Sequence, residues 1–208
     1  LASGSKGNAT IITAGGKNFL IDAGISCRQL TQRIKETGMQ PEDLDGVLLT
    51  HRTPRPYQRP AGIQSVNTTC RCLPTSQPGA VCRSAVKWNA AAASAAKVLE
   101  TEGLKIENFA VPHDAAGAVG YVFNYAGARC VYLTDVGFIT KEIKNNVAGA
   151  DTLVLEATDE EMLKKGIYPY ALKQRILGTR GIYPTKPRLA AFADGAAAGE
   201  VILAHLSQ

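Results

Sequence analysis

Three short apolar runs, each ending in a potential metal ligand, constrain this chain more than any other feature. The runs are 47–51, 131–135 and 201–205, and they end in His51, Asp135 and His205. Apolar runs of this length are typical of buried strands. Side chains at the carboxyl ends of strands meet at one rim of a sheet, where α/β proteins place their chemistry. The sequence therefore predicts an α/β protein with these three side chains at one rim.

The chain has only three histidines, and the third, His113, stands in the segment Val111-Pro112-His113-Asp114. A single histidine is more often a core or rim residue with satisfied hydrogen bonds. Here every histidine stands at a strand end or in a loop, and three imidazoles with one carboxylate are the ligand set of a zinc-type site. We therefore predict a metal site formed by His51, His113, Asp135 and His205.

Length and composition are those of one globular domain over residues 1–208, with 45% hydrophobic and 20% charged residues. The net charge of +5 permits an anionic partner such as nucleic acid, although the basic residues are scattered. We find no apolar run of transmembrane length and no signal peptide, so we expect a cytoplasmic protein without a membrane partner. Because the chain starts at Leu1 inside a motif, we expect a few further residues at each end. The sequence does not define the oligomeric state.

The cysteines do not form a recognisable metal or disulfide framework. There are five of them, an odd number at irregular spacing: Cys27, Cys70, Cys72, Cys82 and Cys130. A clip of Cys70, Cys72 and Cys82 is an alternative, but it lacks the paired CxxC spacing of structural zinc sites. Free thiols in a reducing compartment are the preferred interpretation.

Turn and capping signals divide the chain into hairpins, strands and helices. Gly15-Gly16 predicts a hairpin over 8–22, and Ala126-Gly127 predicts a second one over 120–133. Ser26 is an N-cap for a helix that ends near Gly38. Further expected elements are a loop at 41–45, strands at 46–50, 152–155 and 201–204, and helices at 140–147 and 173–177. The segment 52–60 is too rich in proline for regular structure, and order returns near 104. This order predicts an α/β sandwich with helices outside the sheets.

Short motifs spread in order over nearly the whole chain resemble those of the metallo-β-lactamase fold. The matching segments are 1–8 (LASGSKGN), 20–24 (LIDAG), 48–51 (LLTH), 111–116 (VPHDAA), 120–123 (GYVF), 134–137 (TDVG), 155–157 (LEA), 168–177 (YPYALKQRIL) and 203–207 (LAHLS). Each motif is weak alone, and together they are specific. The resemblance is to the bacterial YycJ-like (WalJ-like) subgroup of metal-dependent hydrolases. It implies an α/β (α+β) fold, a four-layer αβ/βα sandwich with a metal site at one edge.

The resemblance also implies roles for individual residues. His51 and His113 would hold a first metal ion, Asp135 would bridge to a second ion, and His205 would bind that second ion. Asp22 would orient the metal ligands as a carboxylate behind them. The cofactor would be zinc or manganese, one or two ions per chain.

The activity that the resemblance implies is phosphodiester hydrolysis, in a subgroup with members described as exonucleases or phosphodiesterases. Asp135 would position the attacking water as well as bind metal, and His205 could act as an acid if it holds no metal. The loop from Ser3 to Asn8 would line the mouth of the site, so Ser3, Ser5 and Asn8 are candidate substrate contacts.

The chain departs from the family at the motif His-x-His-x-Asp-His, which reads His51-Arg52-Thr53-Pro54-Arg55-Pro56 here. The first site keeps His51, His113 and Asp135, which is an adequate catalytic set, whereas the second keeps only Asp135 and His205. We therefore hypothesise that the chain binds one ion at most. Arg55 either grips a substrate phosphate in place of the missing cation or is a solvated loop residue.

Three classes of function remain open at this stage. A metal-dependent phosphodiesterase or nuclease is preferred. A hydrolase of another ester, a lactone or a β-lactam is possible on the same fold, because a fold does not choose its chemistry. A metal-poor pseudoenzyme that only binds nucleic acid or protein is the third. Steep salt dependence of DNA binding and sensitivity to chelators would separate them.

Overall fold

The computed structural model of the protein describes residues 1–3, 7–51, 98–112, 117–156 and 186–204, with 186–190 as backbone only. The chain divides into two compact units, and the described part of the first lies within Leu1–Leu49. The second unit contains Thr50 and His51 together with the described residues from Val98 onward. No helix within these ranges is long and apolar enough to cross a membrane.

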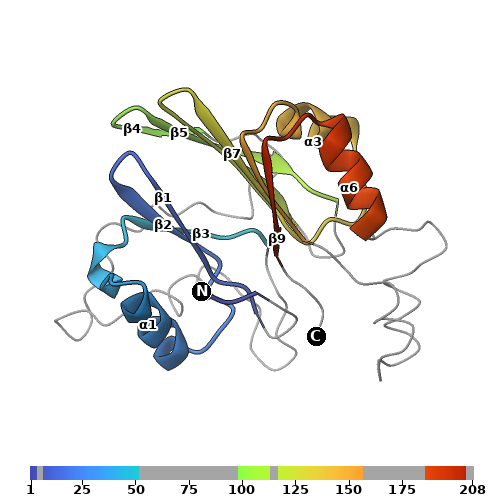
Figure 1. Cartoon of the computed structure of the whole chain (residues 1–208). Helices are drawn as coiled ribbons and strands as arrows, with labels where there is room; N and C mark the ends of the chain where they lie inside the picture. Colours follow the sequence, from blue (N-terminus) through green and yellow to red (C-terminus); the bar gives the residue numbers. More distant parts are fainter. Residues whose placement is uncertain (4–6, 52–97, 113–116, 157–185, 205–208) are drawn as a thin grey trace, which may run out of the picture. The chain divides into compact units, whose positions relative to one another are not determined.

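The first unit is built on a three-stranded sheet in the order β1-β2-β3 (Figure 1, blue to cyan). Its strands are β1 (Thr10–Ala14), β2 (Lys17–Ile21) and β3 (Gly46–Leu48). The predicted hairpin is present: β1 and β2 pair antiparallel, and Gly15 and Gly16 both have positive φ, as a tight hairpin turn requires. β3 joins β2 in parallel and is buried along its whole length.

Helix α1 (Cys27–Glu36) and the short 3₁₀ helix η1 (Pro41–Asp43) connect β2 to β3. The Ser26 side chain accepts the Gln29 N–H, and the Gln29 side chain returns to Ser26 in a capping box, which confirms the predicted helix start. The apolar face of α1 carries Leu30 and Ile34, which are buried in a cluster with residues of the sheet. The sheet and α1 are therefore one β-plus-helix layer pair.

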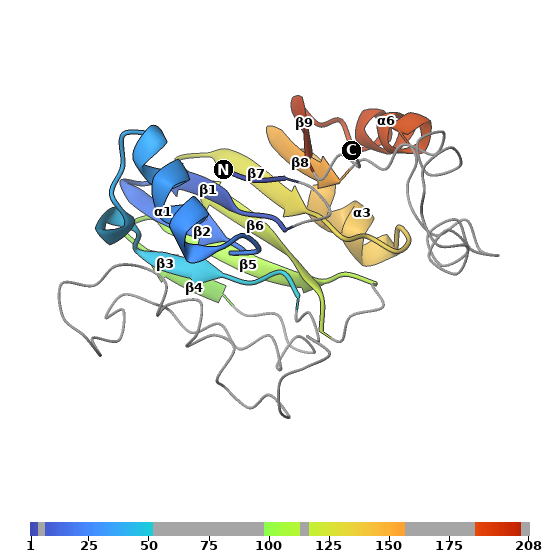
Figure 2. The same ribbon diagram turned by 90° about the horizontal axis from the view of Figure 1, so that it is seen from below.

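The second unit is built on a six-stranded sheet in the order β4-β5-β6-β7-β8-β9. Its strands are β4 (Val98–Thr101), β5 (Leu104–Ala110), β6 (Val119–Tyr125), β7 (Ala128–Leu133), β8 (Thr152–Glu156) and β9 (Glu200–Ala204). Neighbours are antiparallel from β4 to β7 and parallel from β7 to β9. The ends of β5, β7, β8 and β9 and the start of β6 therefore share one edge of the sheet (Figure 2).

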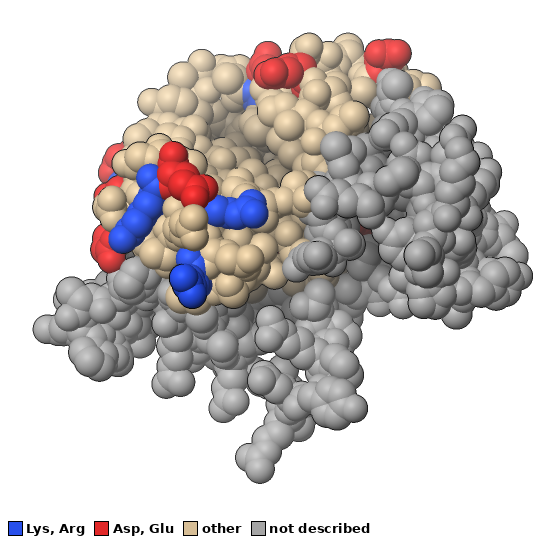
Figure 3. Space-filling model, turned by 60° about the horizontal axis from the view of Figure 1, so that its bottom comes forward, with Lys and Arg blue, Asp and Glu red and all other residues tan. Residues whose placement is uncertain are grey.

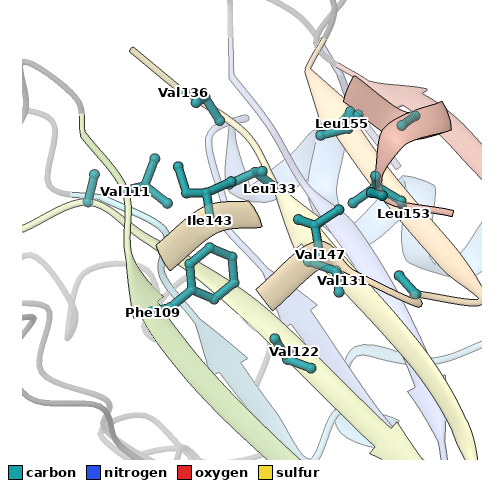
Figure 4. Packing of buried hydrophobic residues seen from close by; sticks show 14 residues of the cluster. Phe109, Val111, Val122, Val131, Leu133, Val136, Ile143, Val147, Leu153 and Leu155 are labelled. Carbon is teal, nitrogen blue, oxygen red and sulfur yellow. The ribbon is translucent and has the colours of Figure 1, made fainter. Parts of the chain in front are cut away.

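Helices α3 (Lys141–Val147) and α6 (Lys186–Gly195) pack on this sheet through one apolar cluster. Figure 4 shows Ile143 and Val147 of α3 beside Val131 and Leu133 of β7. The cluster also contains residues of β5, β6 and β8 and Ala193 of α6, so both helices contribute to the same core. The second unit thus repeats the pairing of a sheet with outer helices, as predicted for an α/β sandwich.

Several element boundaries differ from the sequence-based expectation. The strand expected over 46–50 ends at Leu48, and the loop expected over 41–45 contains η1, which Pro41 can start because helix N-termini tolerate a missing N–H. β4 and α6 were not expected. β4 pairs with β5 around a turn at Glu102-Gly103, where both residues have positive φ. The predicted helix at 173–177 and the irregular segment at 52–60 lie outside the described residues.

Candidate metal centre

A histidine and an aspartate meet at the shared edge of the six-stranded sheet. The Nδ1 atom of His51 lies 3.4 Å from Oδ2 of Asp135, and their side chains are 17% and 11% exposed. The same ring nitrogen lies 3.0 Å from Oγ1 of Thr50. His51 and Asp135 both belong to the second unit, so this pair is internal to one compact part of the chain.

Backbone hydrogen bonds set both residues in place. The N–H of Val119, at the start of β6, donates to the Thr50 carbonyl over 2.7 Å and thereby fixes the segment that carries His51. Asp135 follows the end of β7 by two residues and has a left-handed backbone, with φ of 57°. Its N–H donates to Oε2 of Glu156, at the end of β8, over 2.5 Å.

The other two predicted ligands, His113 and His205, lie outside the described residues, but the residues that precede them are described. The Pro112 carbonyl accepts the N–H of Gly137 over 2.6 Å, two residues after Asp135. Ala204, the last residue of β9, pairs with Glu156 in the sheet register. The described neighbours Pro112 and Ala204 therefore belong to the edge that carries His51 and Asp135.

The chemistry of the described pair fits a metal ion. Two ligand atoms bound tetrahedrally to one zinc, each at about 2.0–2.2 Å, lie about 3.4 Å apart, and His51 Nδ1 and Asp135 Oδ2 are 3.4 Å apart. The same distance also fits a second arrangement, in which Nδ1 of His51 carries the proton and faces the Asp135 carboxylate. In that arrangement Nε2 of His51 would bind the ion, as is common for ligand histidines that donate to a carboxylate. Within the described ranges no group of three or more potential ligand side chains comes together.

The first unit holds the remaining described site candidates at the edge of its own sheet. Asp22, 8% exposed, follows β2 and also has a left-handed backbone, with φ of 56°. Its N–H donates to the Leu48 carbonyl over 2.9 Å. Asn8 is 9% exposed, and its carbonyl accepts the N–H of Gly24 over 2.7 Å. The Ser3 side chain is exposed.

Two predicted substrate contacts, Ser5 and Arg55, lie outside the described residues, as do Thr53 and Pro56. The roles of Ser3, Asn8 and Asp22 stay predictions.

Glu156 is the site residue that the sequence analysis missed. It is 8% exposed and ends the apolar run Leu153-Val154-Leu155, the same signal that marked Asp135 after β7. An acidic residue at the end of a buried strand was therefore visible in the sequence. Its hydrogen bond to the Asp135 backbone was not.

Comparisons with known families identify the class of this protein. The sequence profile described as "Beta-lactamase superfamily domain" matches residues 63–206, and the one described as "Metallo-beta-lactamase superfamily" matches residues 2–51. The chain belongs to the metallo-β-lactamase superfamily, as the motifs predicted. It is a hydrolase of that superfamily, whose chemistry depends on metal.

The curated relatives carry a more specific name. The chain is 29% identical to the "Exodeoxyribonuclease YycJ" of Bacillus anthracis over 223 residues, covering 100% of this chain and 81% of the relative. It is 31% identical to the "Exodeoxyribonuclease WalJ" of Streptococcus pneumoniae serotype 2 over 188 residues, covering 87% of this chain and 70% of the relative. These matches confirm the predicted subgroup.

Solved structures confirm the fold class. The crystal structure of human tRNase Z, short form, superimposes with a TM-score of 0.65 at 16% sequence identity. The match covers 97% of this chain and 86% of the tRNase Z chain. At this identity the likeness establishes the metallo-β-lactamase fold and nothing about substrate.

Charges of both signs are mixed on the face of the described residues drawn in Figure 3. On the face in Figure 3, Lys and Arg side chains lie among Asp and Glu side chains and do not form a patch of one sign.

Proposed function

We propose that this protein is a metal-dependent phosphodiesterase that cleaves DNA as an exonuclease. The observation that carries the proposal is the His51–Asp135 pair, 3.4 Å apart at the edge where the strand ends of the six-stranded sheet meet. The names of the relatives from B. anthracis and S. pneumoniae support DNA as the substrate.

His51, His113 and Asp135 would hold the ion, and Asp135 and His205 are the residues left for a second one. Three protein ligands suffice for a catalytic zinc, whereas two are few for firm binding. We therefore propose one tightly held zinc or manganese ion per chain. Asp22 would orient the ligands as a buried carboxylate.

When bound, the ion would supply Lewis-acid activation of a water molecule and would offset negative charge on a phosphate. The carboxylate of Asp135 would orient that water by accepting its hydrogen, since a carboxylate is only an acceptor when ionised. His205, if it holds no metal, would donate a proton to the departing oxygen of the DNA strand. Ser3, Ser5 and Asn8 would contact the substrate, and Arg55 would pair with a phosphate.

The direct test follows release of nucleotides from end-labelled single-stranded and double-stranded DNA, with and without a chelator and with zinc or manganese restored. We expect turnover that a chelator abolishes and metal restores. His51→Ala and Asp135→Asn should each lower turnover by more than about 100-fold, because removing a ligand costs more than removing its supporting partner. Glu107→Gln is a matched control, since Glu107 pairs with Lys105 over 2.9 Å on the same sheet.

Three further readouts test the number of ions, the class of function and the role of Arg55. Metal counting on the purified protein should give one equivalent per chain; two equivalents would contradict the one-ion proposal. DNA that binds with a steep salt dependence but is never cleaved, in any metal, would instead indicate a binding-only relative. Arg55→Ala should weaken DNA binding, and unchanged binding would remove Arg55 from the site.

A further inference from the structure

The carboxylate of Glu156 is buried beside a candidate metal ligand and holds the backbone of that ligand. Glu156 is 8% exposed, and its Oε2 atom accepts the N–H of Asp135 over 2.5 Å. A buried carboxylate is costly unless hydrogen bonds compensate it. A hydrogen bond from a backbone N–H to an ionised carboxylate is among the stronger ones. The Glu156 side chain thus helps to fix the position of the Asp135 backbone.

This hydrogen bond lies beyond the end of the pairing between β7 and β8. Leu133 and Leu155 are the last residues paired between β7 and β8, and Asp135 lies two residues beyond that pair. Its φ of 57° is in the left-handed region, which aspartate tolerates better than most residues other than glycine. The Glu156 side chain therefore accepts the Asp135 N–H beyond the last pair of β7 and β8.

The first unit provides an internal comparison. Asp22 has nearly the same φ, 56°, and is likewise followed two residues later by a glycine. Its N–H is held by a backbone carbonyl, that of Leu48, over 2.9 Å. In the first unit a main-chain carbonyl thus accepts this N–H. In the second unit a carboxylate takes that place.

We infer that Glu156 is a positioning residue, which orients Asp135 toward the metal ion by holding its backbone N–H. The inference rests on the metal site proposed above. The register also pairs Glu156 with Ala204, the residue before His205. Glu156 therefore lies between the chain segments that carry two of the predicted ligands.

The experiment compares Glu156→Gln, which keeps an oxygen able to accept the N–H, with Glu156→Leu, which has similar bulk and no acceptor. Zinc and manganese affinities are measured by calorimetry on folded protein, and unfolding is measured separately with chelator present. We expect Glu156→Leu to weaken metal binding by about 10- to 100-fold, the usual effect of losing a partner of a metal ligand. Glu156→Gln should lose less than about tenfold. Glu107→Gln, the same substitution elsewhere on the sheet, should bind metal as the wild type does.

Three results would overturn the inference. If Glu156→Leu lowers stability in chelator while the folded protein keeps its metal affinity, Glu156 is only structural. If Glu156→Gln loses as much affinity as Glu156→Leu, Glu156 is a metal ligand. If the wild type binds no metal, the site and the inference fail together. A wild type that binds metal but leaves DNA intact would contradict the proposed function alone. The metal affinities of Glu156→Gln and Glu156→Leu would still test whether Glu156 positions Asp135.

Discussion

Replacing Gly24 by alanine should destabilise the first unit at the loop predicted to contact substrate. Gly24 lies two residues after Asp22, and its backbone touches that of Gly7 and Asn8. A Cβ atom on Gly24 would lie 2.6 Å from the Asn8 nitrogen and 2.6 Å from the Gly7 Cα. Both neighbours are main-chain atoms, so no flexible side chain can move aside.

The cost follows from these distances. Restoring an ordinary contact of 3.4 Å from 2.6 Å requires the two backbone segments to separate by about 0.8 Å. That displacement would also break the hydrogen bond from the Gly24 N–H to the Asn8 carbonyl, now 2.7 Å long. Overpacking costs about 1–3 kcal/mol, and a lost hydrogen bond about 0.5–1.5 kcal/mol. We therefore expect Gly24→Ala to lower the free energy of unfolding by about 2–4 kcal/mol.

The assay is urea unfolding with chelator present, so that metal binding does not contribute to stability. Gly195→Ala is the matched control, because a Cβ there meets no heavy atom within 4 Å and Gly195 ends helix α6. The control should leave stability unchanged or raise it by up to about 1 kcal/mol. A Gly24→Ala variant within about 0.5 kcal/mol of wild type would refute the close approach of these two segments.

Two further predictions concern single side chains of the described residues. Ser26→Ala removes the N-cap of α1, so the free energy of unfolding should fall by about 1 kcal/mol in the same urea assay; an unchanged value would mean that the cap contributes nothing. Burial raises the pKa of the Cys130 thiol, so less thiolate is present at pH 7.5, and iodoacetamide should modify Cys130 more slowly than it modifies a free thiol peptide. Peptide mass spectrometry over time measures this rate, and modification as fast as that of the peptide would contradict it.

Local sequence signals predicted the hairpins and helix starts correctly because their causes are local. Gly15-Gly16 and Ala126-Gly127 adopt the positive φ values that tight hairpin turns require. Ser26 and Thr140 cap α1 and α3 through hydrogen bonds within one helical turn. Each of these contacts joins residues a few positions apart, so a short window of sequence contains all the information.

The apolar runs that end in a polar residue predicted which side chains belong to the edge of the sheet. His51 and Asp135 were proposed on that signal alone, and the described residues bring them within 3.4 Å. The roles of His113 and His205 stay predictions. Glu156 carried the same signal and was overlooked, because an acidic residue at a strand end does not reveal which backbone group it will meet.

Sequence alone thus predicted the hairpin turns and the described strands other than β4, since alternation and turn chemistry depend on neighbouring residues. Strand order and register came from tertiary structure, because pairings such as Leu133 with Leu155 and Glu156 with Ala204 join residues far apart in the chain. The hydrogen bond from Asp135 to Glu156 exists only once β7 and β8 are aligned in that register. Because a one-residue slip would turn Glu156 to the opposite face, packing of the whole sheet sets the geometry of the site.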